Sequence, residues 1–356
     1  MYTASNADAL FGWYKKNGRN LPWRETKEPY PIWLSEVMLQ QTQVMKVIPY
    51  YHRWLIRFPT LASVAEAEPE SLLKVWEGLG YYQRCHNFRQ AAVLVRDRYR
   101  GVIPSDYERF RALPGVGEYT AAAVLSMAFG KPLPVMDGNV KRVLARYLGM
   151  RKLSPVNLRR MHAFLRKQIS HERPGLFNQA MMELGARICR PRSPFCEQCP
   201  LAGSCRALAR GKVESYPRKT ARKPVPHYEV VIGLLWRKNH FLITRRKANG
   251  HLGGLWELPG GKIESGEAPE SALRREFLEE CRTSIAVGSP VGAVKHTYSH
   301  FSIHLQLYHC YPHNSAAILP VQSHRWIKPE EIDRYPFPAA NHKLFALCRE
   351  QDWRHD

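Results

Sequence analysis

The stretch Leu113–Ala121, LPGVGEYTA, decides how the first half of the chain folds. Gly115 and Gly117 permit a tight backbone turn, and an alanine-rich helix is predicted to start directly after them. The exposed amides at the start of that helix can hold a phosphate oxygen, because the helix dipole adds a partial positive charge there. An ordinary turn between helices is the alternative, but the complete nonapeptide favours a phosphate-binding hairpin.

Helical periodicity surrounds this hairpin on both sides. Apolar residues recur at three- and four-residue spacing, as in Leu72–Leu79 and Val140–Tyr147. Short turns such as PTLAS (59–63) and RGVIP (100–104) separate these segments. The sequence therefore predicts an all-α domain over residues 1–205.

The pattern changes after the helical part. Residues 206–227 are basic, contain prolines and are weakly periodic, which is typical of a linker. From residue 228 the segments EVVIGLLWR (229–237) and FSIHLQLYHCY (301–311) predict strands, with one helix from about Ala268 to Arg282. Residues 228–356 are therefore predicted to form an α+β domain, which makes the chain multidomain.

Charge is distributed unevenly between these parts. The whole chain carries a formal net charge of +22, with 37 basic and 17 acidic residues in 1–225 against 16 and 14 in 226–356. A polycation of this size predicts a polyanionic partner, most commonly nucleic acid. No apolar run has the length of a membrane span, and the N-terminus lacks the features of an export signal. We therefore expect no membrane association and a cytoplasmic or nucleoid-associated location.

Four of the eight cysteines crowd into a short segment with the spacing C-x6-C-x2-C-x5-C: Cys189, Cys196, Cys199 and Cys205. Without an export signal, this spacing indicates a metal site rather than a disulfide framework. Structural zinc and an iron–sulfur cluster are both candidates, and the single C-x2-C pair with a wide x6 gap suits the larger group. Arginines beside the cysteines would give such a loop a phosphate-binding surface.

Two carboxylates stand in noteworthy positions. Asp137 in VMDGNVKRV precedes a predicted helix, where a routine N-cap is the common explanation. Glu36 lies within the apolar stretch IWLSEVML, where a paired structural glutamate is equally compatible with the sequence. Neither residue identifies an activity by itself.

Together with the hairpin and the cysteine spacing, these residues resemble the iron–sulfur branch of the helix-hairpin-helix DNA glycosylases, and within it the MutY family of adenine DNA glycosylases. The resemblance covers residues 1 to about 210. It rests on LPGVGEYTA and on three further passages, LPWR (21–24), WLSEVMLQQTQV (33–44) and WEGLGYYQR (76–84). It implies excision of adenine opposite 8-oxoguanine or guanine in double-stranded DNA, by a monomer that holds a [4Fe–4S] cluster on the four cysteines.

The resemblance also implies catalytic roles. Cleavage of an N-glycosidic bond needs a protonated leaving base and a stabilised sugar cation, and burial can raise the pKa of a carboxyl enough to make it an acid at neutral pH. Glu36 is then expected to protonate the adenine ring, and Asp137 to stay ionised and stabilise the cation. Tyr119 and Asn139 are expected to orient these groups.

Further roles follow from the same resemblance, because the adenine must leave the duplex to be reached. Arg24 and Gln179 are expected to line the adenine pocket. Gln41 and Thr42 are expected to probe the helix beside the lesion, and Tyr81 to wedge between bases. Without the family context, core packing would be the preferred explanation for Tyr81.

The C-terminal domain contains a nearly complete Nudix box. Gly261, Glu267 and the run from Arg275 to Glu280 match its pattern, whereas Arg282 replaces the final glycine. Glu276, Glu279 and Glu280 would share one helix face suited to Mg²⁺. Because Arg282 is unfavourable at a left-handed position and this domain reads DNA in the MutY family, we expect Mg²⁺ not to be needed and no useful nucleotide hydrolysis.

The segment HTYSHF (296–301) resembles the MutY loop that reads 8-oxoguanine, so Ser299 and His300 are expected to contact the lesion. Three alternatives stay open from the sequence. They are a pyrimidine glycosylase/lyase like endonuclease III, a catalytically idle damage-binding protein, and a bifunctional enzyme with an active Nudix site. Endonuclease III relatives carry a catalytic lysine where this chain has Tyr119, which argues for a monofunctional glycosylase.

Overall fold

The structure is a computed structural model of the chain and describes residues 4–218, 224–248, 250, 252–298, 300–313, 318 and 320–353. The chain forms two compact units. The first, here called the helical unit, consists of Met1–Glu66 and Asn87–Ala221. The second, the C-terminal unit, consists of Ala67–His86 and Arg222–Asp356.

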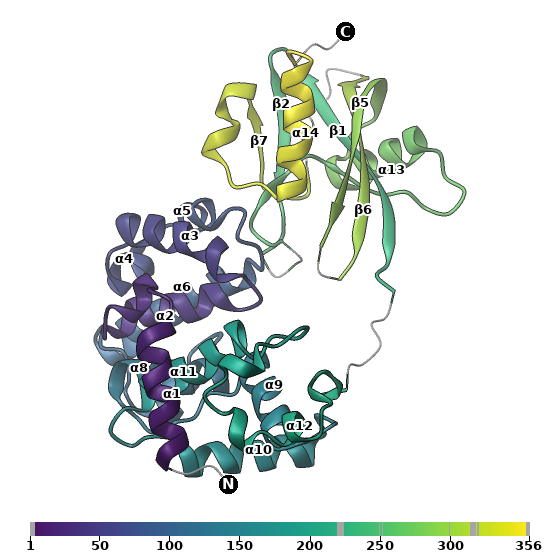
Figure 1. The fold of residues 1–356 in the computed structure, drawn as a ribbon. Helices are drawn as coiled ribbons and strands as arrows, with labels where there is room; N and C mark the ends of the chain where they lie inside the picture. Colours follow the sequence, from purple (N-terminus) through teal and green to yellow (C-terminus); the bar gives the residue numbers. More distant parts are fainter. Residues whose placement is uncertain are drawn as a thin grey trace. The chain divides into compact units, whose positions relative to one another are not determined.

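The helical unit is built from helices and short turns, as predicted (Figure 1). Its helices are α1 (Ala4–Asn17), α2 (Pro29–Leu39), α3 (Val44–Arg57), α4 (Leu61–Glu66), α6 (Gln83–Tyr99), α7 (Tyr107–Arg111), α8 (Glu118–Phe129), α9 (Gly138–Tyr147), α10 (Pro155–Gln168), α11 (Pro174–Arg187) and α12 (Arg206–Ala209). Only the first turn of α6 belongs to the C-terminal unit. Within the described residues, no helix is long and apolar enough to cross a membrane.

Two packed regions hold the helical unit together. An aromatic group joins α2, α3, α6 and α7, where Trp33 meets Phe88 and Phe110 edge to face at ring-centroid distances of 4.9 and 5.1 Å. The second region packs apolar side chains of α1, α9, α10 and α11, among them the buried Leu144 and Phe177. Alanines fill the buried face of α8, so α2 can approach it closely. This approach brings the first turn of α8 beside α2.

A mixed sheet organises the C-terminal unit, in the order β3-β2-β1-β6-β5, with β4 paired to β1 and β7 paired to β2. The strands are β1 (His227–Arg237), β2 (His240–Arg245), β3 (Trp256–Glu257), β4 (Gly260–Lys262), β5 (Ile285–Thr297), β6 (Ser302–Pro312) and β7 (His324–Ile327). β1 and β6 run parallel and the other pairs are antiparallel. The strands expected at 229–237 and 301–311 are both present.

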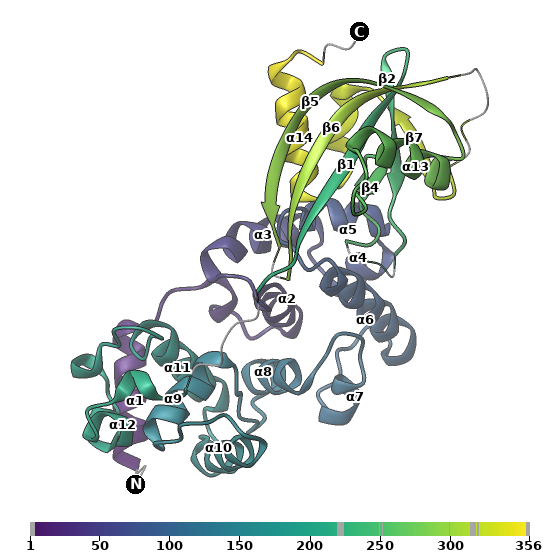
Figure 2. The same cartoon turned by 90° about the vertical axis from the view of Figure 1, so that its right-hand side faces the viewer.

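One helix covers each face of this sheet (Figure 2). α13 (Pro269–Cys281) buries Leu273 and Phe277 against one face, and α14 (Ala339–Glu350) buries Leu344 and Phe345 against the other. Gly233 permits the close approach of α13, because a Cβ atom there would stand 2.6 Å from the Phe277 ring. The predicted fold class, a helical domain followed by a domain with a sheet and one prominent Nudix-box helix, is confirmed.

Residues 67–86, which include α5 (Pro69–Trp76), group with the C-terminal unit rather than with the other helices. The expected domain boundaries at 205 and 228 assign residues 67–86 to the helical domain, because helical periodicity does not reveal against which partner a helix packs. The position of the linker at 206–227 stays a prediction.

Candidate active site

Glu36 is buried in the middle of α2, among the apolar neighbours that its sequence context indicates. The residue is 3% exposed, and its Oε2 atom has no hydrogen-bond partner within the described part of the chain. Burial raises the pKa of Glu36 to about 7, and the nearby Asp137 charge adds to the rise, whereas the Tyr119 hydroxyl and Arg24 oppose it. Near neutral pH this carboxyl can therefore donate a proton.

Asp137 is the N-cap of α9, and both of its carboxylate oxygens accept hydrogen bonds. Its Oδ1 accepts a hydrogen bond from the Val140 amide at 2.6 Å, and its Oδ2 accepts one from Asn139 Nδ2 at 2.9 Å. The two bonds hold the carboxylate in one orientation at the start of the helix. The N-cap explanation is thus correct for Oδ1, and the carboxylate nevertheless lines the same cavity as Glu36.

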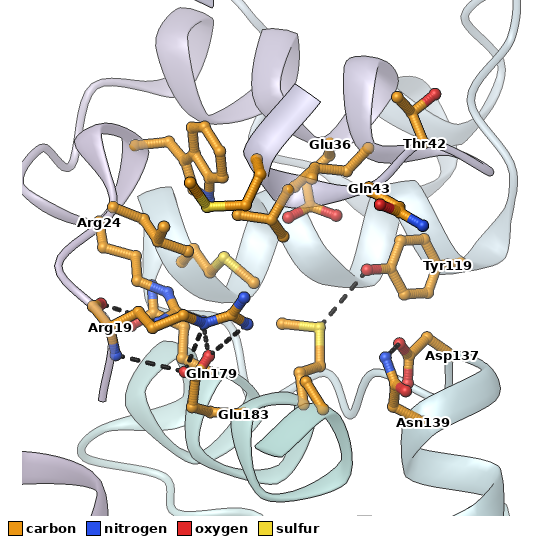
Figure 3. A pocket seen from close by; sticks show the side chains of 18 residues that line it. Arg19, Arg24, Glu36, Thr42, Gln43, Tyr119, Asp137, Asn139, Gln179 and Glu183 are labelled. Carbon is orange, nitrogen blue, oxygen red and sulfur yellow. Dashed lines mark hydrogen bonds and ion pairs between the residues drawn. The ribbon is translucent and has the colours of Figure 1, made fainter. Parts of the chain in front are cut away.

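Tyr119 stands in the first turn of α8, between the two carboxyls (Figure 3). Burial raises the pKa of its phenol well above the ordinary value, and the charges of Glu36 and Asp137 raise it further. The hydroxyl therefore stays protonated, and it donates to Met182 Sδ at 3.4 Å. A neutral phenol in this place can orient the carboxyls without serving as a nucleophile.

Arg24 and Gln179, the two residues expected around the adenine, meet at the opposite wall of the cavity. Gln179 accepts a hydrogen bond from Tyr14 at 3.1 Å, and the Arg24 guanidinium lies over the Tyr14 ring. Arg24 also donates to Glu183 Oε2 at 2.8 Å, and Arg19 donates to both Glu183 oxygens, at 2.7 and 2.9 Å. The wall of the cavity is therefore a fixed network of hydrogen bonds.

Sequence reasoning missed Glu183 and Arg19. Glu183 is fully buried, and its burial alone would raise its pKa, but hydrogen bonds from Arg19 and the charge of Arg24 hold the pKa below the usual range. Its spacing of four residues from Gln179 on α11 was the available signal, because residues at i and i+4 share a helix face.

The cavity that these residues enclose has a volume of about 500 Å³, enough for a nucleobase and part of its sugar. Figure 3 shows the carboxyls and the phenol entering it from α2, α8, α11 and the start of α9, and the two arginines entering it from the segment between α1 and α2. Seven of the expected site residues line it: Arg24, Glu36, Thr42, Tyr119, Asp137, Asn139 and Gln179. Gln43 and Met45, which were not expected, also line its rim.

Of the residues expected to contact the bases, Thr42 lines this cavity, whereas Gln41, Tyr81 and His300 do not. Gln41 is exposed with a left-handed φ of 56° between α2 and α3, and Tyr81 has a left-handed φ of 52° in the C-terminal unit. His300 is exposed after β5, and Ser299 lies outside the described residues.

The hairpin between α7 and α8 has the tight turn that the glycines predict. Gly115 adopts a φ of +76°, and a Cβ atom on it would stand 2.8 Å from Asn87 Cβ. Gly117 has an ordinary φ of −90° and caps α8 without a side chain. Only Gly115 therefore needs glycine for its backbone conformation.

The four cysteines line one small cavity with Arg146, whose Nη1 donates to Cys189 Sγ at 3.3 Å. Burial raises the pKa of the Cys189 thiol, and it raises that of Cys199 to about 12. Thiolates in such surroundings need the positive charge of bound metal. In the described ranges, no three His, Cys, Asp or Glu side chains stand close enough to hold a single metal ion. The four thiols nevertheless line one cavity beside a cationic side chain, a donor set that fits an iron–sulfur cluster.

A chain of hydrogen bonds connects the cysteine loop to the carboxylate. Arg142 donates to Asn139 Oδ1 at 2.8 Å and to the Cys189 carbonyl at 2.8 Å, and Asn139 in turn donates to Asp137. A displacement of the cysteine loop would therefore shift Asp137 through the side chains of Arg142 and Asn139.

The Nudix-box acids of the C-terminal unit are already paired. Arg275 donates to both oxygens of Glu267 at 3.0 Å and to Glu276 at 2.8 Å, and it stands 3.8 Å from Glu279. Burial raises the pKa of Glu280 to about 7, and the neighbouring charges of Glu257 and Glu276 add to the rise. Glu280 is therefore only partly ionised at neutral pH. Arg282 has the left-handed φ of 51° that the missing glycine would suit.

Residues 34–164 match the HhH-GPD superfamily base excision DNA repair protein family, and residues 231–347 match the NUDIX domain family. The chain is 33% identical to the adenine DNA glycosylase of Homo sapiens, across 96% of this chain and 74% of that protein. It is 34% identical to the adenine DNA glycosylase of Buchnera aphidicola subsp. Acyrthosiphon pisum (strain APS), across 83% of each. The solved structure of a trapped endonuclease III–DNA covalent intermediate is similar with a TM-score of 0.50 and 26% identity, across 59% of this chain and 99% of that one.

Proposed function

The chain belongs to the adenine DNA glycosylase family, and we propose that it hydrolyses the N-glycosidic bond of adenine paired with 8-oxoguanine or guanine in duplex DNA. The observation that carries the proposal is the pair of carboxyls in one cavity with opposite environments. Glu36 is buried and its Oε2 has no hydrogen-bond partner among the described residues, whereas Asp137 accepts two hydrogen bonds. These different environments suit Glu36 to act as a proton donor and Asp137 to act as a carboxylate.

Glu36 acts as the general acid. A protonated Glu36 donates its proton to a ring nitrogen of the extruded adenine, so the bond between the sugar and the base can break with its electron pair leaving on the base. Water then adds to the sugar carbon, and the proton it releases returns to Glu36. The apolar surroundings of Glu36 keep this proton available near pH 7.

Asp137 stabilises the positive charge that develops on the sugar ring. Its hydrogen bonds from Val140 and Asn139 fix the carboxylate before the reaction, so little reorganisation accompanies bond cleavage. Asn139 is itself held by Arg142 and acts as a positioning residue for Asp137.

The wall made by Arg24, Gln179 and Glu183 selects the base. These side chains present donors and acceptors in fixed directions, and a base that lacks the complementary groups would leave buried polar atoms unpaired. We propose that this wall binds the edge of adenine.

We propose monofunctional chemistry and a monomeric enzyme. Tyr119 occupies the position of the lyase lysine and remains a neutral phenol, so it offers no amine for a Schiff base with the sugar. Both carboxyls and the base-binding wall line one cavity of this chain, which supports a site that a single copy carries.

Lesion recognition is assigned to residues that, apart from Thr42, lie outside the cavity lining. Gln41 and Thr42 probe the helix beside the lesion, Tyr81 wedges between bases, and Ser299 and His300 read the 8-oxoguanine. Gly115 and Gly117 open the hairpin that holds the DNA backbone through the amides at the start of α8.

Cys189, Cys196, Cys199 and Cys205 would hold a [4Fe–4S] cluster. When bound, the cluster supplies positive charge and a rigid loop, and adenine hydrolysis needs no electron transfer. Arg190, stacked on Phe195 at 4.0 Å, gives this loop a cation suited to a DNA phosphate.

The proposal is tested with duplexes that contain adenine opposite 8-oxoguanine, guanine or thymine. Glu36→Gln and Asp137→Asn should each remove excision and leave duplex binding intact, whereas Glu172→Gln, at an exposed glutamate, should keep both. Substantial excision by the Glu36 or Asp137 variant contradicts the role of that residue. Equal wild-type rates opposite thymine and 8-oxoguanine contradict the substrate assignment.

A further inference from the structure

Residues 67–86 fall inside the HhH-GPD family match, yet they pack within the C-terminal unit. They contain α5 and the loop that ends with Tyr81. The residues proposed to read the lesion strand, Tyr81 and His300, therefore belong to one compact unit, and the carboxyls belong to the other.

Glu77 makes the central contact between this segment and the rest of the C-terminal unit. Its Oε1 accepts hydrogen bonds from the Phe337 amide and from His342 Nε2, both at 2.7 Å, and its Oε2 accepts one from Lys74 Nζ at 2.7 Å. Burial alone would raise the pKa of Glu77, but these hydrogen bonds hold it below the usual range. The carboxylate is thus ionised and joins three donors from two parts of the chain.

Other contacts fix the same segment. Glu70 accepts a hydrogen bond from Trp256 Nε1 at 3.0 Å, and Lys74 donates to the Tyr335 carbonyl at 2.9 Å. His86 lies 2.9 Å from the Gly253 carbonyl at the other end of the segment. The segment is therefore attached at both ends, with Glu77 next to the loop.

The loop after Glu77 is rigid and strained. Gly78 and Gly80 have left-handed φ values of 87° and 85°, and Tyr81, which has a side chain, has 52°. Trp76 Nε1 donates to the Gly80 carbonyl at 3.1 Å, and Arg84 donates to it at 2.9 Å. A non-glycine residue keeps such a conformation only where its surroundings impose it.

We propose that Glu77 is a positioning residue through which the C-terminal unit fixes the Tyr81 loop, and that it thereby sets the preference for 8-oxoguanine over guanine. This inference rests on the proposed function of Tyr81 and of the lesion-reading loop. It assigns lesion discrimination to a residue that does not line the cavity of the two carboxyls.

Glu77 can fix the position of Tyr81 because the two residues are close neighbours in the chain. Only three residues separate Glu77 from Tyr81, and the intervening loop is closed by its own hydrogen bonds, so a shift of Glu77 moves the tyrosine ring. A lesion bound by the C-terminal unit and a tyrosine inserted between bases then act as one rigid body. When the hydrogen bonds of Glu77 are lost, the contact of Tyr81 with the bases and the contact of the C-terminal unit with the lesion have to be ordered separately.

The test uses the full-length protein with Glu77→Ala, His342→Ala and His342→Gln, and with Glu66→Gln as a control at an exposed glutamate one helix earlier. Single-turnover excision is measured on duplexes with adenine opposite 8-oxoguanine and opposite guanine. The fluorescence of 2-aminopurine beside the lesion reports unstacking by Tyr81. Thermal unfolding and circular dichroism check that each variant folds.

We expect the ratio of the two rates to fall about tenfold in Glu77→Ala and His342→Ala, since a charge-assisted bond is lost. The 2-aminopurine signal should weaken with it. His342→Gln should restore both readouts because its amide can donate the same bond, and Glu66→Gln should match the wild type.

An unchanged ratio and fluorescence signal in folded Glu77→Ala and His342→Ala overturn the inference. Equal losses on both duplexes also overturn it, because they indicate a general structural role. A wild type without preference for 8-oxoguanine instead overturns the proposed function, and the 2-aminopurine signal then still tests the position of Tyr81.

Discussion

Excision should depend on pH through the protonation of Glu36. Because burial raises the pKa of this carboxyl to about 7, the acid form should be about 90% populated at pH 6 and about 1% at pH 9. If the acid form alone reacts, the rate of the chemical step falls roughly 90-fold between these values. The sign is fixed: a required acid loses activity as the pH rises through its pKa.

The assay is single-turnover excision with enzyme in excess over an adenine:8-oxoguanine duplex, from pH 5.5 to pH 9. Fluorescence anisotropy at each pH confirms that the duplex stays saturated, so the profile reports chemistry rather than binding. Tyr119→Phe provides an internal check, because the Tyr119 hydroxyl lowers the pKa of Glu36. Its removal should move the falling limb to higher pH, whatever it does to the maximal rate.

Two results would refute this reasoning. A rate that is flat between pH 6 and pH 9 excludes a titrating acid in this range. A rate that already falls about tenfold per pH unit from pH 5.5 upward, as an unperturbed glutamate pKa of about 4.3 requires, would mean that burial does not govern this carboxyl in the DNA complex.

Monofunctional chemistry predicts abasic products that are not nicked before alkali treatment, and borohydride should trap no covalent complex because Tyr119 supplies no amine; efficient trapping contradicts this. Purified protein should contain about four irons per chain, and Cys199→Ser should lower iron content and DNA affinity together, whereas stoichiometric zinc after anaerobic purification would refute the cluster. No Mg²⁺-dependent pyrophosphate release from 8-oxo-dGTP is expected, and release that disappears in Glu279→Gln would make the enzyme bifunctional. Arg282→Gly should stabilise the protein by about 1 kcal/mol, because glycine adopts the left-handed φ at this position without strain. The control Arg274→Gly, within α13, should destabilise the protein by about the same amount. Equal unfolding midpoints in guanidinium for the two variants would contradict backbone strain at Arg282.

Local sequence determined the features that depend on neighbouring residues. The turn at Gly115 follows from a backbone conformation that only glycine adopts without cost, and the left-handed Arg282 follows from the end of the Nudix helix. The raised pKa of Glu36 could be expected from Trp33, Leu34, Val37 and Met38, since a helix through such residues is buried on all sides. The α2 and α13 helices and the long strands β1 and β6 likewise follow from periodicity.

Tertiary structure alone decided which distant groups meet. Asp137 reads as a helix cap in the sequence, and only the packing of α9 on α11, which itself packs on α8, brings its carboxylate to the cavity of Glu36. Glu183 carries no motif, and its arginine partners lie more than 150 residues earlier in the chain. The helical pattern of residues 67–86 likewise does not show that they pack with the C-terminal unit. Periodicity fixes which face of an element is apolar, but the partner of that face is chosen by the shape and polar pairing of surfaces that the chain brings together only on folding.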